Sequence, residues 1–291
     1  MTPQPGPRRC SRTSSIAEGV LRRTFGPLLA ALITLFATAA SASDPAVDLF
    51  PRAASGYIVA INGKPRWARA PDSPRAPASL TKVLTALVLL EHDWQPHAEI
   101  VVSPHAGHAP GARLGLRAGE RVYAAELLDA MLVASANDAC LALAEAAAGS
   151  ARAFVERMNQ RAASLGMTAS HFEDPCGFDQ PRQVTTPNDL LRLTEVALSH
   201  TAFAQAIAQA RGEVHTLGGR RLSYATSNLL LGRLEGAQGV KTGQTSNAGR
   251  CLIGLVTRGT TQVIIVLLDA PDRWWAAAVL IEEAFRAAQS G

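Results

Sequence analysis

The chain has 291 residues, of which 47% are hydrophobic, and a formal net charge of +4 at pH 7. That length can bury the core of one large domain or of two closely packed ones. Five arginines and one glutamate within residues 1–42 account for the whole excess of positive charge, because the remainder holds 23 basic and 23 acidic residues. The charge balance therefore excludes an extended nucleic-acid-binding surface, and no nucleic-acid partner is expected.

Residues 1–42 have the organisation of an export signal. A basic segment ends at Arg23, an apolar run of about 15 residues follows, and Ala-Ser-Ala at 40–42 offers a cleavage site. The apolar run is shorter than the roughly 20 residues of a membrane-spanning helix. Arg22 and Arg23 also fit a twin-arginine signal. We expect a signal peptide at 1–42, export by the Sec or Tat route to the periplasm or cell-wall space, and membrane association only if this leader is retained.

The segment after the leader begins with a predicted hairpin. The Asn62-Gly63 dipeptide between GYIVAI and KPRWAR is typical of a tight turn between antiparallel strands. A proline-rich connector then leads to a helix predicted to begin at Ser79. This helix is apolar nearly all round, which indicates a buried central position.

The middle of the chain, about residues 121–210, is predicted to be mostly helical within a subdomain at about 95–210, with Thr186 and Pro187 as cap and first residue of one helix. Apolar strands at 251–257 and 261–270 and a helix at 274–288 follow. This order predicts an α/β fold of the α+β type. An antiparallel sheet completed by both ends of the chain is flanked by helices, and a mostly helical domain is inserted into it.

Three cysteines follow the leader: Cys140, Cys176 and Cys251. At most one disulfide can form among them, so at least one thiol stays free. Their spacings match no metal site, and we expect neither a metal nor a cofactor. His105 and His108, in a loop rich in proline and glycine, are expected to face solvent.

Only three of the 28 basic residues are lysines, and one of them, Lys82, stands at the head of the apolar helix. An amine can lose its proton when it is desolvated, whereas arginine stays charged. Ser79 and Lys82 are spaced i and i+3, so they share a helical face. A partly deprotonated Lys82 could take the hydroxyl proton and make Ser79 a nucleophile.

Two further motifs carry polar groups at predicted element ends. Ser135 and Asn137 lie at a break between two helices, where a hydroxyl could relay a proton and an amide could hold a substrate. Lys241, Thr242 and Gly243 end a predicted strand, where an amine, a hydroxyl and an unhindered backbone suit a peptide carboxylate at a sheet edge.

In the order S-x-x-K, S-x-N, K-T-G, these motifs resemble those of penicillin-binding proteins and serine β-lactamases. Over about residues 55–285 the chain is most similar to the low-molecular-mass serine D-Ala-D-Ala carboxypeptidases, above all in segments 77–91, 127–145, 158–179 and 239–259. The resemblance implies a DD-peptidase/β-lactamase-like fold over 43–291 and a short form of the family, without its C-terminal domain.

The resemblance also implies a mechanism on peptidoglycan stem peptides. Ser79 would form an acyl-enzyme with the penultimate D-alanine, with Lys82 as base, and β-lactams would be trapped on the same serine. Ser135 would pass the proton toward the leaving amine beside Lys241, and Asn137 would bind the substrate backbone. The terminal carboxylate would meet Lys241, Thr242 and Thr245 alongside Gly243, and the N–H groups of Ser79 and Gln244 would form the oxyanion hole.

Departures from the family leave alternatives open. Cys176 stands where the family commonly has serine, either as a tolerated small residue or as a thiol at the cleft rim. Short relatives include D,D-endopeptidases that cut cross-links, and a non-catalytic wall-binding protein is the non-enzyme alternative. A class A β-lactamase is not expected, because Glu173 is followed by Asp-Pro-Cys-Gly and not by the x-x-L-N of its deacylation motif.

Overall fold

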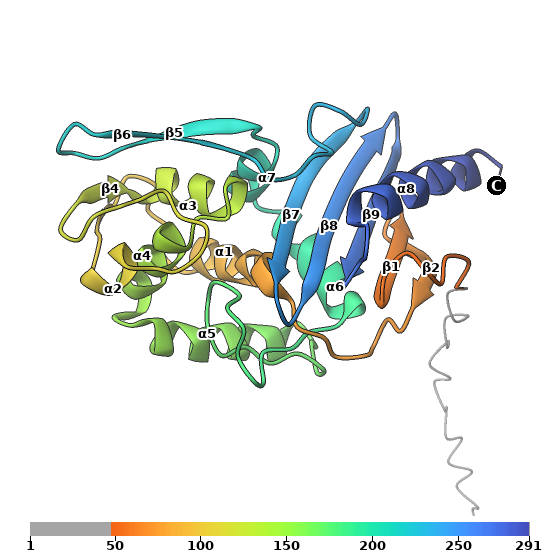
Figure 1. Ribbon diagram of the computed structural model, residues 1–291, viewed down its shortest axis with the longest axis horizontal. Helices are drawn as coiled ribbons and strands as arrows, with labels where there is room; N and C mark the ends of the chain where they lie inside the picture. The colour runs from red at the N-terminus through yellow and green to blue at the C-terminus, as the bar shows by residue number, and fades with distance from the viewer. Residues whose placement is uncertain (1–47, 291) are drawn as a thin grey trace, which may run out of the picture. The chain divides into compact units, whose positions relative to one another are not determined.

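The computed structural model describes residues 48–290, so the expected signal peptide lies outside the described residues. A five-stranded sheet with the order β2-β1-β9-β8-β7 is antiparallel throughout (Figure 1). Strands from the two ends of the described chain meet in it, as predicted. Its strands are β1 (Gly56–Ile61), β2 (Lys64–Arg69), β7 (Ala237–Thr245), β8 (Gly249–Arg258) and β9 (Thr261–Leu268).

Both predicted hairpins of this sheet are present. Ile61 pairs with Lys64 across the β1–β2 turn, and Asn62 and Gly63 both have positive φ, at 49° and 75°. That backbone conformation is the reason an Asn-Gly pair is favoured there. Arg258 pairs with Thr261 across the β8–β9 turn.

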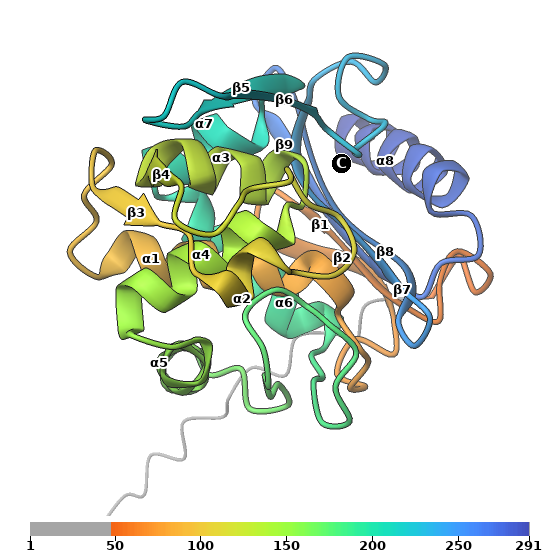
Figure 2. The same ribbon diagram turned by 60° about the vertical axis from the view of Figure 1, so that its left-hand side comes forward.

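The sheet is covered on both faces (Figure 2). Tyr57 and Val59 of β1 pack in one cluster with helix α8 (Arg273–Gln289), whereas Ile58 and Ala60 pack in the larger cluster with the other helices. This alternation follows from the two-residue period of a strand. Because β8 and β9 are buried on both faces, their sequences are nearly continuous apolar runs.

The central helix starts later than the sequence predicted. Residues Ala78–Thr81 form a 3₁₀ turn, η1, and the α-helix α1 runs over Lys82–Glu91. Ala78 has a positive φ of 48°, and Gly177 and Gly243 both approach the turn closely. The closely packed 3₁₀ turn thus takes the place of the first α-helical turn. Helix α1 itself is buried along almost its whole length, as expected.

A mostly helical region lies between α1 and β7, in accord with the predicted fold class. The side chain of Thr186 caps α6 by accepting from Asp189 N at 3.1 Å, as predicted. The helices are α2 (Pro104–Gly107), α3 (Ala124–Val133), α4 (Asn137–Ala148), α5 (Ala151–Ser164), α6 (Pro187–Leu198) and α7 (Thr201–Ile207). No helix within residues 48–290 is long and apolar enough to cross a membrane.

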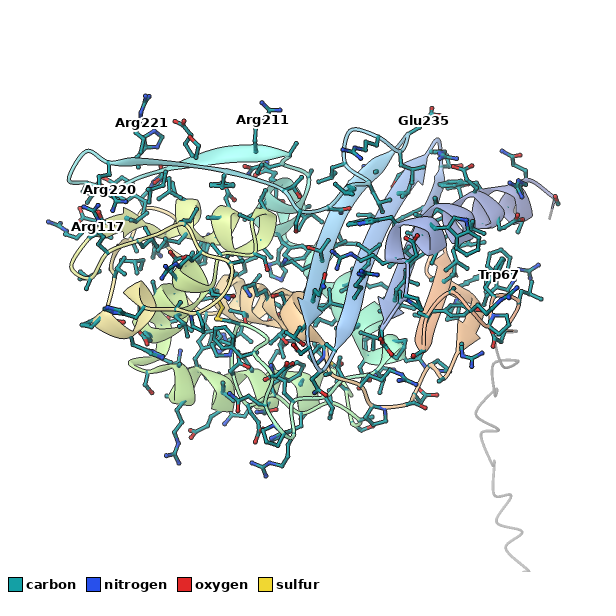
Figure 3. The ribbon with its side chains drawn as sticks, viewed as in Figure 1. Trp67, Arg117, Arg211, Arg220, Arg221 and Glu235 are labelled. Carbon is teal, nitrogen blue, oxygen red and sulfur yellow. A yellow bond between two sulfur atoms is a disulfide. The ribbon has the colours of Figure 1, made fainter. Side chains whose placement is uncertain are left out.

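Two small sheets in this region were not predicted. They pair β3 (Glu99–Val101) with β4 (Arg121–Tyr123), and β5 (Arg211–His215) with β6 (Arg221–Ala225). Each strand buries at most one residue, so none has the long apolar alternation of a core strand. Figure 3 shows Arg211 and Arg221 pointing outward from the β5–β6 hairpin.

Candidate active site

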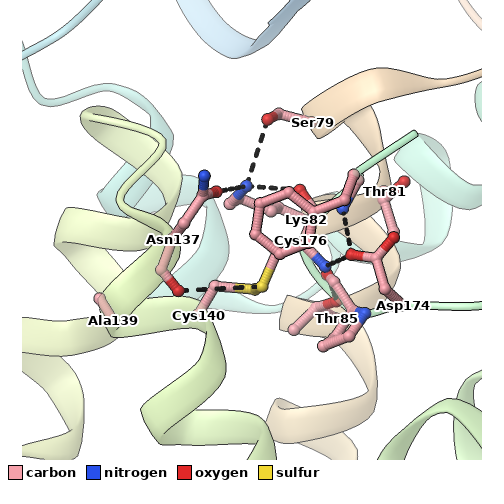
Figure 4. The surroundings of a disulfide bond; sticks show 12 residues. Ser79, Thr81, Lys82, Thr85, Asn137, Ala139, Cys140, Asp174 and Cys176 are labelled. Atoms are coloured by element: carbon pink, nitrogen blue, oxygen red, sulfur yellow. Dashed lines mark hydrogen bonds between the residues drawn. A yellow bond between two sulfur atoms is a disulfide. The ribbon is translucent and has the colours of Figure 1, made fainter. Parts of the chain in front are cut away.

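Ser79 and Lys82 lie at the junction of η1 and α1, where the molecule has a cleft. Lys82 is fully buried, and its Nζ is 3.2 Å from Ser79 Oγ. A 3₁₀ turn brings residues i and i+3 almost into line, so the late start of α1 keeps the two side chains on one face. The spacing that the sequence indicated therefore becomes a direct hydroxyl–amine contact (Figure 4).

The amine of Lys82 has two further partners. It donates to Asn137 Oδ1 at 2.7 Å and to the carbonyl oxygen of Cys176 at 2.5 Å. Burial lowers its pKa to about 7 from an ordinary 10.5, against the opposing effect of Asp174. A neutral amine has two hydrogens and one lone pair. If the two oxygens take the hydrogens, the lone pair is left for the hydroxyl of Ser79.

Ser135, between α3 and α4, and Asn137, the first residue of α4, both line the cleft. Ser135 has a positive φ of 61°, and this sharp turn places it in the cleft wall. The Nδ2 of Asn137 donates to the carbonyl of Pro110 at 2.7 Å, which fixes its amide plane with Oδ1 toward Lys82. Asn137 thus binds the amine of Lys82 directly, and the sequence analysis did not anticipate this contact.

The third motif lies on β7, the edge strand of the large sheet. Lys241 is only 2% exposed, and its Nζ donates to the carbonyl of Thr242 at 3.0 Å. Burial holds the pKa of Lys241 well below its ordinary value, and the neighbouring charges of Lys82 and Arg273 lower it further. Thr242 Oγ1 is 2.5 Å from the hydroxyl oxygen of Ser227.

Glycine is needed at position 243 for a structural reason that the sequence analysis did not give. A Cβ built at Gly243 would lie 2.9 Å from Ser79 N and 3.0 Å from Ala78 Cβ. The missing side chain thus allows β7 to approach the turn that carries Ser79. This close approach brings the two segments expected to supply oxyanion-hole N–H groups, at Ser79 and Gln244, to the same side of the cleft.

The cleft has a volume of about 680 Å³. The chain segments of all three motifs reach it, although the Lys82 and Lys241 side chains are buried behind its wall. Its polar lining includes Ser79, Ser135, Asn137, Asp179, Ser227, Thr242, Gln244, Thr245, Ser246 and Arg273.

Arg273 is the basic side chain in the cleft lining, and the sequence analysis missed it, as it missed Asp179, Ser227 and Ser246. It is the first residue of α8, and one of its guanidinium nitrogens, Nη1, donates to the carbonyls of Gly243 at 2.7 Å and Cys251 at 3.3 Å. It thereby places a cation in the cleft that Thr242 and Thr245 also line. In a chain with 25 arginines, nothing in its local sequence marks it.

Both readings offered for Cys176 are wrong. Cys176 forms a disulfide with Cys140 across 36 residues, with the two Cα atoms 6.0 Å apart, within the usual range for a disulfide. Both cysteines are buried, so Cys176 is neither a free small residue nor a thiol at the rim. Cys251 is the remaining cysteine of residues 48–290; it is free and also buried.

His105 and His108, in and just after the short helix α2, are exposed to solvent as predicted, and each also has a hydrogen-bond partner. His105 Nδ1 is 2.5 Å from Glu145 Oε1, and His108 Nδ1 is 2.7 Å from the carbonyl oxygen of Pro104. Among residues 48–290, no group of three or more His, Cys, Asp or Glu side chains is placed to hold a metal ion.

The comparisons with known proteins agree on one family. A family model described as D-alanyl-D-alanine carboxypeptidase, Peptidase S11, matches residues 52–272. The D-alanyl-D-alanine carboxypeptidase DacF of Bacillus subtilis is 27% identical over 88% of this chain, which spans only 65% of that relative's length.

Two further matches bear on the function. A D-alanyl-D-alanine endopeptidase of Pseudomonas aeruginosa is 31% identical over 83% of this chain and 82% of its own length. The crystal structure of the Streptomyces K15 DD-transpeptidase superposes with a TM-score of 0.74, at 26% identity, over 84% of this chain and 99% of its own.

Proposed function

Because the chain belongs to the D-alanyl-D-alanine carboxypeptidase family of serine peptidases, we propose that it removes the terminal D-alanine from peptidoglycan stem peptides. The observation that carries the proposal is the buried amine of Lys82, 3.2 Å from Ser79 Oγ, with a pKa lowered to about 7. A base with a pKa near the working pH is the one that general base catalysis needs.

In the first step, Ser79 Oγ attacks the carbonyl carbon of the penultimate D-alanine while its proton passes to Lys82. The negative charge that develops on the carbonyl oxygen is met by the backbone N–H groups of Ser79 and Gln244. Oxyanion-hole donors of this kind each contribute about 10²–10³ in rate.

In the second step, the bond to the terminal D-alanine breaks and its nitrogen takes a proton. Ser135 relays this proton from Lys82, with Lys241 nearby, and free D-alanine leaves with the acyl group still on Ser79. A water molecule then attacks the ester carbonyl and gives its proton to Lys82, which passes it to Ser79 Oγ as the ester bond breaks and the shortened peptide leaves. Ser79 is thereby regenerated.

The substrate lies along β7, whose edge position leaves it free to pair with an extended peptide. The terminal carboxylate meets Thr242 and Thr245. Burial lowers the pKa of Lys241, whereas Arg273, which also lines the cleft, supplies the carboxylate with a guanidinium cation. The second N–H of Asn137 Nδ2 is free of the bond to Pro110 and donates to the substrate backbone.

Labelling with fluorescent penicillin tests whether Ser79 is the nucleophile. Penicillin mimics the acyl-D-Ala-D-Ala end, and we expect intact mass and peptide mapping to find a penicilloyl adduct on Ser79 that Ser79→Ala abolishes. Release of D-alanine from a pentapeptide should show the same dependence. A folded wild-type protein that forms no adduct and turns over no penicillin would contradict the acyl-enzyme mechanism and favour a non-catalytic wall-binding protein.

A D,D-endopeptidase is the second candidate, favoured by the similarity to the Pseudomonas aeruginosa endopeptidase. Both activities use the same acyl-enzyme and differ in the leaving amine, which is free D-alanine or the side chain of a cross-linked peptide. Parallel assays on uncross-linked and cross-linked muropeptides separate them, and our proposal expects faster D-alanine release from the uncross-linked substrate.

An efficient β-lactamase is not proposed. Glu173, the acid nearest in sequence to a deacylation motif, accepts from the backbone N and the Nε of Arg182, both at 2.9 Å, and does not line the cleft. We expect the penicilloyl adduct to persist for minutes or longer, which time-resolved intact mass measures.

We also propose that the protein is exported and acts in the periplasm or cell-wall space. Residues 1–42 act as a signal peptide, and 43–291 form the DD-peptidase domain with a helical subdomain at about 95–210. N-terminal sequencing of the protein recovered from the periplasm or cell-wall space should begin near residue 43.

A further inference from the structure

The Cys140–Cys176 disulfide connects the two groups that bind the amine of Lys82. Asn137, which offers Oδ1, lies one turn before Cys140 on α4, and Cys176 offers its own carbonyl oxygen. The two acceptors therefore come from segments that are far apart in sequence and joined by one covalent bond. In the view of Figure 4, the disulfide lies below the Lys82 amine and its acceptors.

The segment that contains Cys176 is held firmly on its other side. Asp174 Oδ1 accepts from the backbone N of Cys176 at 2.7 Å and of Gly177 at 2.8 Å, and its Oδ2 accepts from Gln183 at 2.6 Å. Gly177, with a positive φ of 91°, approaches the carbonyl of Ala78 so closely that no Cβ would fit there. A shift of this segment would therefore change both the Lys82 contact and the packing of the Ser79 turn.

We propose that the Cys140–Cys176 disulfide is a positioning element for the general base, an inference that rests on the proposed function. A neutral Lys82 must donate both hydrogens of its amine, to Asn137 Oδ1 and Cys176 O, so that its lone pair faces Ser79. The disulfide fixes the separation of these two acceptors and so orients the lone pair of Lys82 toward Ser79 Oγ. Without the bond, α4 and the Cys176 segment are held together by non-covalent contacts alone, and the acceptors move independently.

This role predicts a split between the limiting acylation rate and the binding of the acylating compound. The groups proposed to bind the carboxylate lie on β7 and at the start of α8, and neither element carries a cysteine of the disulfide. We expect loss of the disulfide to lower the limiting rate about tenfold, equivalent to about 1.4 kcal/mol of barrier. The dissociation constant of the non-covalent penicillin complex should change by less than about threefold.

The test compares four forms of the full chain by their acylation kinetics with fluorescent penicillin. They are the oxidised protein, the protein prepared and kept in dithiothreitol, the Cys140→Ala/Cys176→Ala variant, and Cys251→Ala as the control. The dithiol supplies two electrons and two protons, which leave Cys140 and Cys176 as thiols and the reductant as a cyclic disulfide. Intact mass verifies the redox state, and all rates are measured well below each form's unfolding temperature.

A lower limiting rate in both disulfide-free forms, with little change in the dissociation constant and none in Cys251→Ala, supports the positioning role. Equal limiting rates in all forms overturn it while leaving the Ser79 mechanism intact. Absence of any adduct in the oxidised protein instead overturns the proposed function itself. If the double variant does not fold, the reduced wild-type protein decides the question, because it carries no substitution.

Discussion

Lys82 and Lys241 are both buried beside the same cleft, yet their surroundings differ. Lys82, at the head of α1, faces the Ser79 hydroxyl and two oxygen acceptors, and its pKa is about 7. Lys241, on β7, donates to the carbonyl of Thr242, and the charges of Lys82 and Arg273 act on it as well as its burial. The comparison teaches that burial alone lowers a lysine pKa, whereas the acceptors around the amine decide whether its lone pair can serve as a base.

The largest effect is expected from Lys82→Arg. Arginine keeps the charge but stays protonated, so it cannot accept the Ser79 proton. General base catalysis is worth about 10²–10⁴, and we expect the limiting acylation rate to fall about 10³-fold, measured with fluorescent penicillin. The exposed third lysine provides the matched control. Lys64→Arg should leave the rate unchanged, and a Lys82→Arg protein as active as this control would refute the base assignment.

A smaller effect is expected from Gly243→Ala, which tests the packing of β7 against the Ser79 turn. The added Cβ would lie 2.9 Å from Ser79 N, so the turn or the strand must shift. Because an oxyanion-hole donor is worth about 10²–10³, we expect the limiting rate to fall about 10²-fold. Gly218→Ala is the control, since a Cβ there meets only Thr216 Oγ1, at 4.0 Å. Equal rates for the two variants would show that the close approach has no catalytic consequence.

Arg273→Gln should have the smallest of the three effects, because it removes binding energy and leaves the Ser79–Lys82 pair in place. We expect KM for a D-Ala-D-Ala peptide to rise about tenfold, the loss of about 1.4 kcal/mol, with kcat changed by less than about threefold. Arg286→Gln, on the exposed last turn of the same helix, is the control. A fall in kcat with KM constant would move Arg273 from carboxylate binding to the chemical step.

The parts of the site that the sequence predicted are those encoded by neighbouring residues. The S-x-x-K spacing indicated the Ser79–Lys82 contact, Asn62-Gly63 indicated the β1–β2 turn, and Thr186 with Pro187 indicated the start of α6. Each of these depends on hydrogen bonds or backbone angles within a few residues. The antiparallel sheet followed from long apolar strands, whose burial on both faces leaves a clear pattern.

The missed parts depend on contacts between distant segments. Arg273 reaches the cleft only because the start of α8 lies beside β7, 32 residues from Lys241. Cys140 pairs with Cys176 because α4 packs against the segment after Asp174, and three cysteines alone allow three pairings. The carbonyl of Cys176 carries no sequence signal at all, since every residue has one. Such contacts cannot be read from local spacing or periodicity.

The pH dependence of the limiting rate of Ser79 acylation by fluorescent penicillin tests most directly whether a neutral Lys82 is the base. With a pKa of about 7, half of the molecules hold a neutral amine near that pH. Our account predicts a rate that falls about tenfold per pH unit below it, as the amine is protonated, and levels off above it. A limiting rate that stays constant from about pH 5 to pH 9 in the folded protein would contradict the account, because no group in that range would then have to lose a proton before Ser79 attacks.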